Sequence, residues 1–108
     1  LGKDYAIRCS TAEDPFTPHD VIITLSQDAL SNIRWRVATN PSAPPEVLAT
    51  LSQDPNWSVR CGVAAATNTP PEVLTSMSKD RAAMVRWYLA RNPHTPYGVW
   101  IGLERILP

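Results

Sequence analysis

The sequence predicts an all-α protein made of stacked pairs of short helices, with no β-sheet. Three observations lead to this prediction. Equivalent residues recur every 26 positions along the whole 108-residue chain. The chain holds 11 prolines, and they stand where helices are expected to start and stop. No segment shows the alternation of apolar and polar residues that is typical of a half-buried strand.

The 26-residue repeat becomes visible when the chain is aligned with itself at that offset. A column is the set of residues that share one place in every repeat. The complete columns are Pro18, Pro44, Pro70 and Pro96; Val21, Val47, Val73 and Val99; Arg8, Arg34, Arg60 and Arg86; Ala12, Ala38, Ala64 and Ala90. We expect one domain over residues 1–108. Its full units are residues 13–38, 39–64 and 65–90, with a partial unit at 1–12 and a partial or capping unit at 91–108.

The first helix of each unit is expected to begin at a proline. In the third unit Thr69 is placed to cap the helix, Pro70 takes its first position and Glu72 its third. This Thr-x-x-Glu pattern is a capping box, in which the two side chains satisfy free backbone N–H groups. The second unit has Ala43 in the place of the capping hydroxyl, which should weaken that cap by about 1 kcal/mol.

The second helix of each unit is expected to follow a turn. The chain turns around residues 54–58, and Ser58 is placed to cap a helix over residues 59–66. Asn40-Pro41 and Asn92-Pro93 should end such helices, because the residue before a proline is pushed out of the helical region. Helices of about ten residues are marginal alone in water. The pairs must therefore stack and share one continuous core.

One run of residues resembles a known family. It reads Asn40-Pro41-Ser42-Ala43-Pro44-Pro45-Glu46-Val47-Leu48-Ala49-Thr50-Leu51-Ser52-Gln53-Asp54, followed by Ser58-Val59-Arg60. These residues resemble the leucine-rich repeat variant family, a bacterial helical repeat. The resemblance implies a right-handed superhelical solenoid with one layer of α-helices and one of short 3₁₀ helices. On that basis the segment at Pro44 would be α-helical and the segment at Val59 would be 3₁₀-like, whereas the residues themselves leave both α and 3₁₀ open for the second helix of each unit. The family has no settled activity, so the resemblance implies a scaffold rather than a reaction.

Charge and composition exclude several classes of function. Ten basic and ten acidic side chains cancel, whereas a dedicated nucleic-acid-binding domain is usually clearly basic. No apolar run approaches the roughly 18 residues of a membrane-spanning helix. The sequence also lacks a Gly-rich phosphate loop, a nucleophile elbow and a paired His-carboxylate signature. We therefore expect a protein that is not an enzyme, takes no cofactor and does not enter a membrane.

The cysteines and histidines are expected to be isolated. Cys9 and Cys61 lie two repeats apart, whereas a disulfide needs Cα atoms within about 7 Å. Both should be free thiols, which favours a cytoplasmic location. His19 and His94 have no second ligand at zinc-binding spacing, so no metal site is expected.

A ladder of acidic and basic side chains is predicted across the turns. In each unit an aspartate precedes an arginine by six residues; the pairs are Asp28 and Arg34, Asp54 and Arg60, and Asp80 and Arg86. This spacing resembles the Asp and Arg ladder of HEAT repeats. A guanidinium can bond a carboxylate and turn carbonyls together, so each arginine can fix its turn and link adjacent units. Loss of Arg60 should then destabilise the fold by leaving Asp54 unpaired.

The same arginines allow an alternative function. Together with Arg8 they would line up as an anion-binding stripe, and residues 55–108 carry six basic and three acidic side chains. The alternative is therefore binding of nucleic acid or another polyanion. The ladder is favoured, because arginines that already have carboxylate partners are poorer phosphate ligands.

Exposed aromatic and arginine side chains are the candidate partner-binding residues. Trp57 shares its column with Ser and Ala, whereas Arg36 and Tyr88 share theirs with Ser and Gly, so these positions are expected to face solvent. The candidate set is Arg36, Trp57, Tyr88 and Arg91. The leading functional hypothesis is a non-catalytic scaffold that binds another protein through one face of its superhelix.

Two further apolar features leave alternatives open. Trp35 and Trp87 alternate with cysteines in one column, which favours a buried packing column over a binding strip. The last segment departs from the pattern and is unusually apolar. It is either a cap or a contact surface, and exposed solenoid ends would allow self-association. The residues that set it apart are Gly98, Trp100, Ile101, Ile106 and Leu107.

Overall fold

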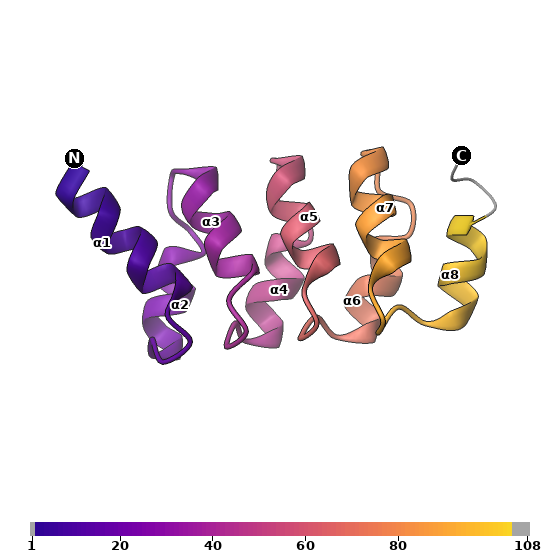
Figure 1. The fold of residues 1–108 in the computed structure, drawn as a ribbon, viewed down its shortest axis with the longest axis horizontal. Coiled ribbons are helices and arrows are strands. Elements are labelled where there is room, and N and C mark those ends of the chain that lie inside the picture. The colour runs from indigo at the N-terminus through magenta and orange to yellow at the C-terminus, as the bar shows by residue number, and fades with distance from the viewer. Residues whose placement is uncertain (1, 105–108) are drawn as a thin grey trace.

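The computed structural model of the chain describes residues 2–104, over which it has eight α-helices and no strand. This confirms the all-α prediction (Figure 1). The helices are α1 Gly2–Glu13, α2 His19–Leu25, α3 Ser31–Ala38, α4 Pro45–Leu51, α5 Trp57–Ala65, α6 Pro71–Ser76, α7 Ala83–Arg91 and α8 Tyr97–Glu104.

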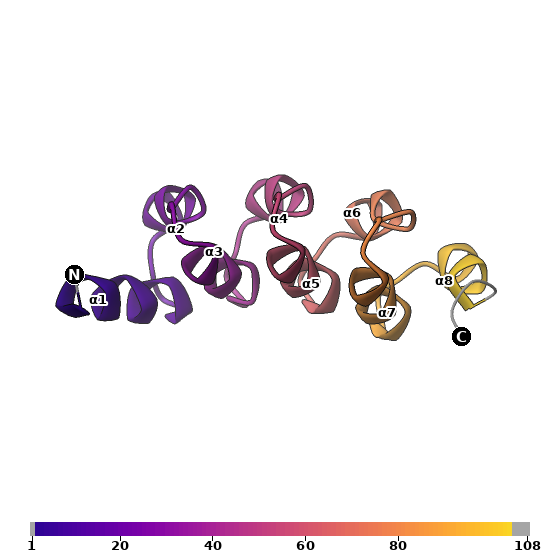
Figure 2. The same cartoon turned by 90° about the horizontal axis from the view of Figure 1, so that it is seen from above.

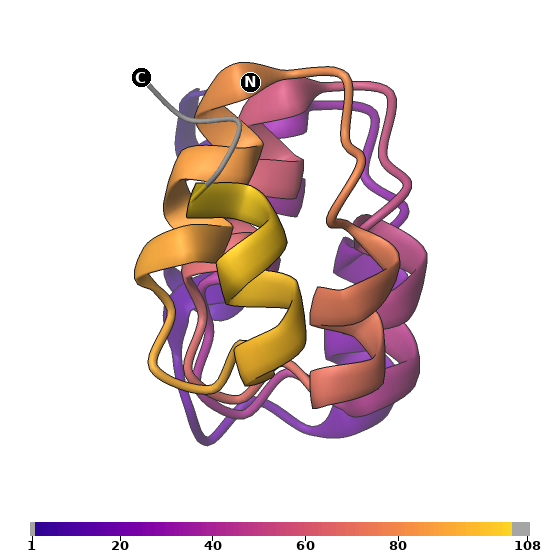
Figure 3. The same ribbon diagram turned by 90° about the vertical axis from the view of Figure 1, so that its right-hand side faces the viewer.

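The helices stand side by side along an axis of 46 Å, and the molecule measures 22 by 17 Å across that axis. Figure 2 shows two rows: α2, α4 and α6 form one, and α1, α3, α5 and α7 form the other. Seen along the long axis, the helices of each row lie behind one another, and α8 lies at the end beside α7 (Figure 3). The helices α2, α4, α6 and α8 begin at intervals of 26 residues, and so do α3, α5 and α7.

The core lies between the two rows. Nine side chains with no exposed surface come in three sets, each spaced by 26 residues: Ile22, Leu48 and Leu74; Ile33, Val59 and Val85; Val37, Val63 and Leu89. The first set comes from α2, α4 and α6, and the other two come from α3, α5 and α7. Each such side chain contributes about 1.5–3 kcal/mol when it leaves water. Because these helices have only 6–9 residues, this shared core is what stabilises them.

The predicted capping box is wrong. Thr69 does not cap α6; its hydroxyl donates instead to the carbonyl of Val63, six residues earlier, at 2.8 Å. The N-cap residue is Pro70, which makes no side-chain cap bond, and Pro71 is the first helical residue. Thr17 and Thr95 make the same backward bond at 2.7 and 2.6 Å. The extended proline after each threonine separates the threonine hydroxyl from the helix that follows. The hydroxyl therefore bonds a carbonyl in the last turn of the preceding helix instead.

Ala43 occupies the threonine position in the second unit and is buried. We expect Ala43→Thr to raise the free energy of unfolding by about 0.5–1.5 kcal/mol, because its hydroxyl can reach the Val37 carbonyl as its equivalents reach theirs. Urea denaturation would measure the change. Ala43→Val is the matched control, since it adds the same bulk without the hydroxyl. Equal stabilisation by valine would contradict the hydrogen-bond explanation.

The second helix of each pair begins at a different residue from the one predicted. Asn56, rather than Ser58, caps α5: its side-chain oxygen accepts the Ser58 backbone N–H at 2.8 Å. The Ser58 hydroxyl donates to the same oxygen at 2.6 Å. This helix is also α-helical over Trp57–Ala65, so the 3₁₀ geometry implied by the resemblance for the segment at Val59 is wrong here. Its apolar side chains pack at α-helical spacing.

Two buried asparagines join consecutive helix pairs. Asn40 is 1% exposed, and its amide donates to the carbonyls of Ala12 at 2.8 Å and Asp14 at 3.0 Å. Its side-chain oxygen accepts the Ser42 N–H at 2.8 Å. Asn92 makes the same three kinds of bond at the equivalent place in the later pair. These asparagines therefore do more than end a helix before proline, because each satisfies backbone groups of two successive segments.

The last described helix is half covered. In α8, Leu103 is buried, whereas Trp100 is 38% exposed although its column mates Ile22, Leu48 and Leu74 are fully buried. Ile101 is partly buried and Gly98 is exposed. Ile106 and Leu107 lie outside the described residues.

Candidate functional site

The ladder arginines bond forward along the stack. Arg34 donates to the Asp54 carboxylate from Nε at 2.7 Å and from Nη2 at 3.2 Å, and its Nη1 donates to the Asp28 carbonyl at 2.7 Å. Arg60 repeats this geometry, with the Asp80 carboxylate at 2.8 and 3.2 Å. The hydrogen bond to Asp54 raises the pKa of Arg34, so this guanidinium stays charged. Each arginine thus holds its own turn and the next one.

The carboxylate partners expected six residues before Arg34 and Arg60 are therefore wrong. Arg60 reaches the Asp54 backbone carbonyl at 2.7 Å, while the Asp54 carboxylate belongs to Arg34. The physical reason is the turn itself, in which Asp54 Oδ1 accepts the Asn56 N–H at 2.9 Å and so faces the preceding helix pair. Loss of Arg60 would leave Asp80, not Asp54, without its guanidinium.

Arg8 also reaches forward along the stack, since its Nε lies 2.9 Å from the Asp28 carboxylate. Arg86 donates to the Asp80 carbonyl of its own turn. Arg34 and Arg60 have their donors directed into the protein, and the Arg60 side chain is only 4% exposed. An anion-binding stripe would need these donors to face solvent. The geometry consequently gives the polyanion alternative little support.

A second feature lies on the exposed side of α3, α5 and α7. Four large apolar side chains gather there, and each is 39–52% exposed: Trp35, Trp57, Met84 and Trp87. We call this side the aromatic face. A cluster of large apolar side chains exposed to solvent is typical of an interaction surface.

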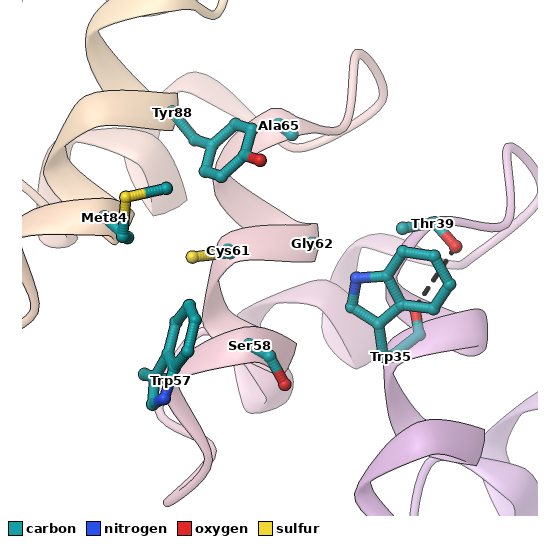
Figure 4. A pocket seen from close by; sticks show the side chains of 9 residues that line it. All are labelled: Trp35, Thr39, Trp57, Ser58, Cys61, Gly62, Ala65, Met84 and Tyr88. Carbon is teal, nitrogen blue, oxygen red and sulfur yellow. Dashed lines mark hydrogen bonds between the residues drawn. The ribbon is translucent and has the colours of Figure 1, made fainter.

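The aromatic face contains an apolar hollow of about 270 Å³. Figure 4 shows Trp35 of α3 on one side, Met84 and Tyr88 of α7 on the other, and Cys61 of α5 between them. The nine residues that line the hollow carry no charge; they are Trp35, Thr39, Trp57, Ser58, Cys61, Gly62, Ala65, Met84 and Tyr88.

Gly62 allows the two tryptophan-bearing helices to come close. A Cβ atom at this position would lie 3.2 Å from the Trp35 ring and 3.2 Å from the Ala38 side chain. Gly62 is buried, so the expectation that its column faces solvent is wrong at this residue. The absence of a side chain leaves room for the Trp35 ring beside α5.

The predicted packing column of tryptophans and cysteines is also wrong in part. Cys61 is 6% exposed, and Cys9 is partly buried, but Trp35 and Trp87 keep 40% and 39% of their surface in contact with solvent. An indole is too large to fit the space that a cysteine fills between neighbouring helices. Burial raises the pKa of the Cys61 thiol, with a further contribution from Asp80. The floor of the hollow is thus neutral and apolar.

The four candidate residues lie on α3, α5 and α7. Trp57 and Tyr88 line the hollow. Arg91 is exposed and places its guanidinium carbon 3.8 Å from the centre of the Trp87 ring. Arg36 does not line the hollow, since its side chain forms an ion pair with Glu13 of α1.

Sequence reasoning missed Trp35, Met84 and Trp87 as members of this surface. Trp35 and Trp87 were visible as a recurring aromatic position, but their column mates pointed to burial. No sequence pattern indicated that Met84 is exposed, because a single methionine in a helix is usually part of a core.

Metal-ligand clusters and membrane-spanning helices are both absent from residues 2–104. No group of three or more His, Cys, Asp and Glu side chains is arranged to hold a metal ion in this part of the chain. In the same range every helix is too short or too polar to reach across a lipid bilayer.

Comparison with known proteins gives one match. Neither the curated proteins nor the solved structures contain a significant match to this chain. The family model described as leucine rich repeat variant matches residues 33–56, which begin in α3, contain all of α4 and end at the cap of α5. The resemblance seen in the sequence is confirmed over this segment, which is similar to a family of helical repeats.

Proposed function

We propose that this protein is a non-catalytic helical-repeat scaffold that binds another protein through the aromatic face. In this proposal residues 1–108 form one right-handed solenoid of 26-residue units, and the protein works in the cytoplasm with reduced thiols. The observation that carries the proposal is the cluster of half-exposed tryptophans around an apolar hollow. Trp, Tyr and Arg are the residues that most often dominate binding energy at protein interfaces.

The arginine ladder has a structural role, which supports placing the binding surface elsewhere on the protein. Arg34 and Arg60 are used within the stack, which leaves the aromatic face as the surface with unused contact groups. A repeat scaffold of this kind offers an extended surface rather than a catalytic cleft.

The test is a selection of random dodecapeptides displayed on phage against the immobilised protein. We expect Trp57→Ala to lose at least about 90% of the binding of the selected peptides, because a truncated anchor typically costs 2 kcal/mol or more. Its melting temperature should stay within about 3 °C of the wild type, since half of the Trp57 side chain is already exposed to solvent.

The matched control is Phe16→Ala, which removes a 91% exposed aromatic ring outside the aromatic face. It should leave binding unchanged. Peptides that bind Trp57→Ala as well as the wild type would contradict the proposed face. Salt-sensitive binding of duplex DNA or RNA, compared between about 50 and 200 mM salt, would favour the polyanion alternative instead.

A further inference from the structure

We infer that the aromatic face recognises an extended peptide that places one large apolar side chain in the hollow and a carboxylate against Arg91. The inference rests on the proposed function and names the chemistry of the partner. Three observations carry it: the neutral lining of the hollow, the position of Arg91, and the continuity between the two.

The hollow suits a side chain rather than a small-molecule ligand. Its volume of about 270 Å³ is below the range of roughly 300–1,000 Å³ that is typical of ligand pockets. The ring of Trp35, the ring of Tyr88 and the thioether of Met84 surround it without a charged group. Such walls favour a leucine, methionine or aromatic side chain and exclude a charged one.

Arg91 is prepared to bind a carboxylate. Its guanidinium carbon lies over the Trp87 ring, 3.8 Å from the ring centre, and the Tyr88 ring stands at 86° to the same indole with ring centres 5.0 Å apart. Stacking uses the face of the guanidinium and leaves the N–H donors in its plane. Among the side chains that the structure describes, those of residues 4–103, the ion pairs join Arg8, Arg34, Arg36 and Arg60 to carboxylates, and none of them includes Arg91.

The hollow continues toward Arg91. A smaller hollow of about 90 Å³ is lined by Arg91, Asn92 and Pro93, and it shares Ala65 and Tyr88 with the larger one. An extended chain advances about 3.3 Å per residue, and we assign a separation of about two to four residues to two hollows that share two lining residues. The peptide should therefore carry its carboxylate at that distance from the apolar anchor.

Charge complementarity indicates that the partner carries a negative charge at this place. The acidic residues nearest in the chain to Trp57 and Met84 are Asp54 and Asp80, and their carboxylates are already paired with Arg34 and Arg60. Arg91 is the charge that the face leaves available at the edge of the hollow. A bidentate pair with Asp, Glu or a C-terminal carboxylate would use its fork of donors, whereas a basic peptide would be repelled.

The experiment repeats the dodecapeptide selection on the wild type and on Arg91→Gln, a variant that keeps a polar side chain of similar length. We expect wild-type selections to enrich a large apolar residue together with Asp or Glu two to four positions away. Selections on Arg91→Gln should keep the apolar residue and lose the acidic preference. One enriched peptide is then synthesised with its carboxylate and with the corresponding amide. The wild type should bind the acidic form about 10-fold more tightly, and Arg91→Gln should bind both forms equally.

The outcomes separate the two proposals. A selection that yields no peptide, or only peptides that bind equally to Trp57→Ala, would overturn the proposed function and this inference with it. Peptides that need Trp57 but show no acidic preference, or keep the same preference on Arg91→Gln, would overturn this inference alone. Melting curves of each variant confirm that the compared proteins are folded.

Discussion

Arg60→Ala is expected to lower the free energy of unfolding by about 3–5 kcal/mol, because it leaves the Asp80 carboxylate buried without its partner. The Arg60 and Asp80 side chains are only 4% and 8% exposed. The same guanidinium also holds the Asp54 carbonyl, so the turn before α5 loses a bond as well. For a domain of this size the melting temperature should fall by about 12 °C or more.

Urea denaturation followed by circular dichroism would measure this loss. Arg81→Ala is the matched control, since Arg81 is exposed and takes no part in the ion pairs of the described residues. It should change stability by less than about 0.5 kcal/mol. The double variant Arg60→Leu/Asp80→Leu should recover much of the loss, because replacing both buried charges is far less costly than removing one. An unchanged stability in Arg60→Ala would show that the ladder does not support the fold.

Asn40→Ala is expected to cost about 2–4 kcal/mol. The substitution leaves two carbonyls and one N–H, of Ala12, Asp14 and Ser42, without the partner that Asn40 supplies. A buried backbone group without a hydrogen bond costs about 1–3 kcal/mol. Water that enters at the turn can bond some of these groups, so the expected cost is smaller than the sum of three such losses.

Two variants make this prediction specific. Asn40→Asp keeps the shape but replaces the amide donors with acceptors, so at pH 7 it should destabilise the protein at least as much as alanine does. Asn68→Ala removes an amide that makes only longer contacts of 3.3–3.4 Å to the same kind of carbonyl, and it should cost less than about 1 kcal/mol. Equal losses in Asn40→Ala and Asn68→Ala, measured by urea denaturation, would contradict the role given to Asn40.

The sequence was most informative about helices and least informative about side-chain partners. The turn around residues 54–58 predicted a helix over residues 59–66, and Val59 and Val63 of that segment are buried in α5. The direction of Arg60 could not be read from spacing, because the Asp six residues before it and the Asp twenty residues after it are both consistent with a ladder. Only the folded turn decides between them, since it directs the Asp54 carboxylate toward Arg34.

The candidate site was predicted in part for a similar reason. Trp57 is exposed, as its column of small residues indicated. Trp35 was assigned to packing because Cys61 shares its column, although an indole and a thiol need different amounts of space. The hollow depends on the absence of a side chain at Gly62, which lets the Trp35 ring lie beside α5. Sequence alone gave Gly62 no special weight, because its column also contains a tyrosine and an arginine.

The forward direction of the ladder has a consequence for how such a chain can grow. Asp54 accepts the arginine that precedes it, and Arg60, six residues later, binds the aspartate that follows. Each repeat therefore brings one acid for its predecessor and one base for its successor. In a duplicated repeat inserted in the interior, the aspartate would pair with the arginine of the preceding repeat and the arginine with the aspartate of the following one. This aspartate and arginine would together add no net charge. The array can thus gain or lose whole modules during evolution without leaving a buried ion unmatched at the new junction.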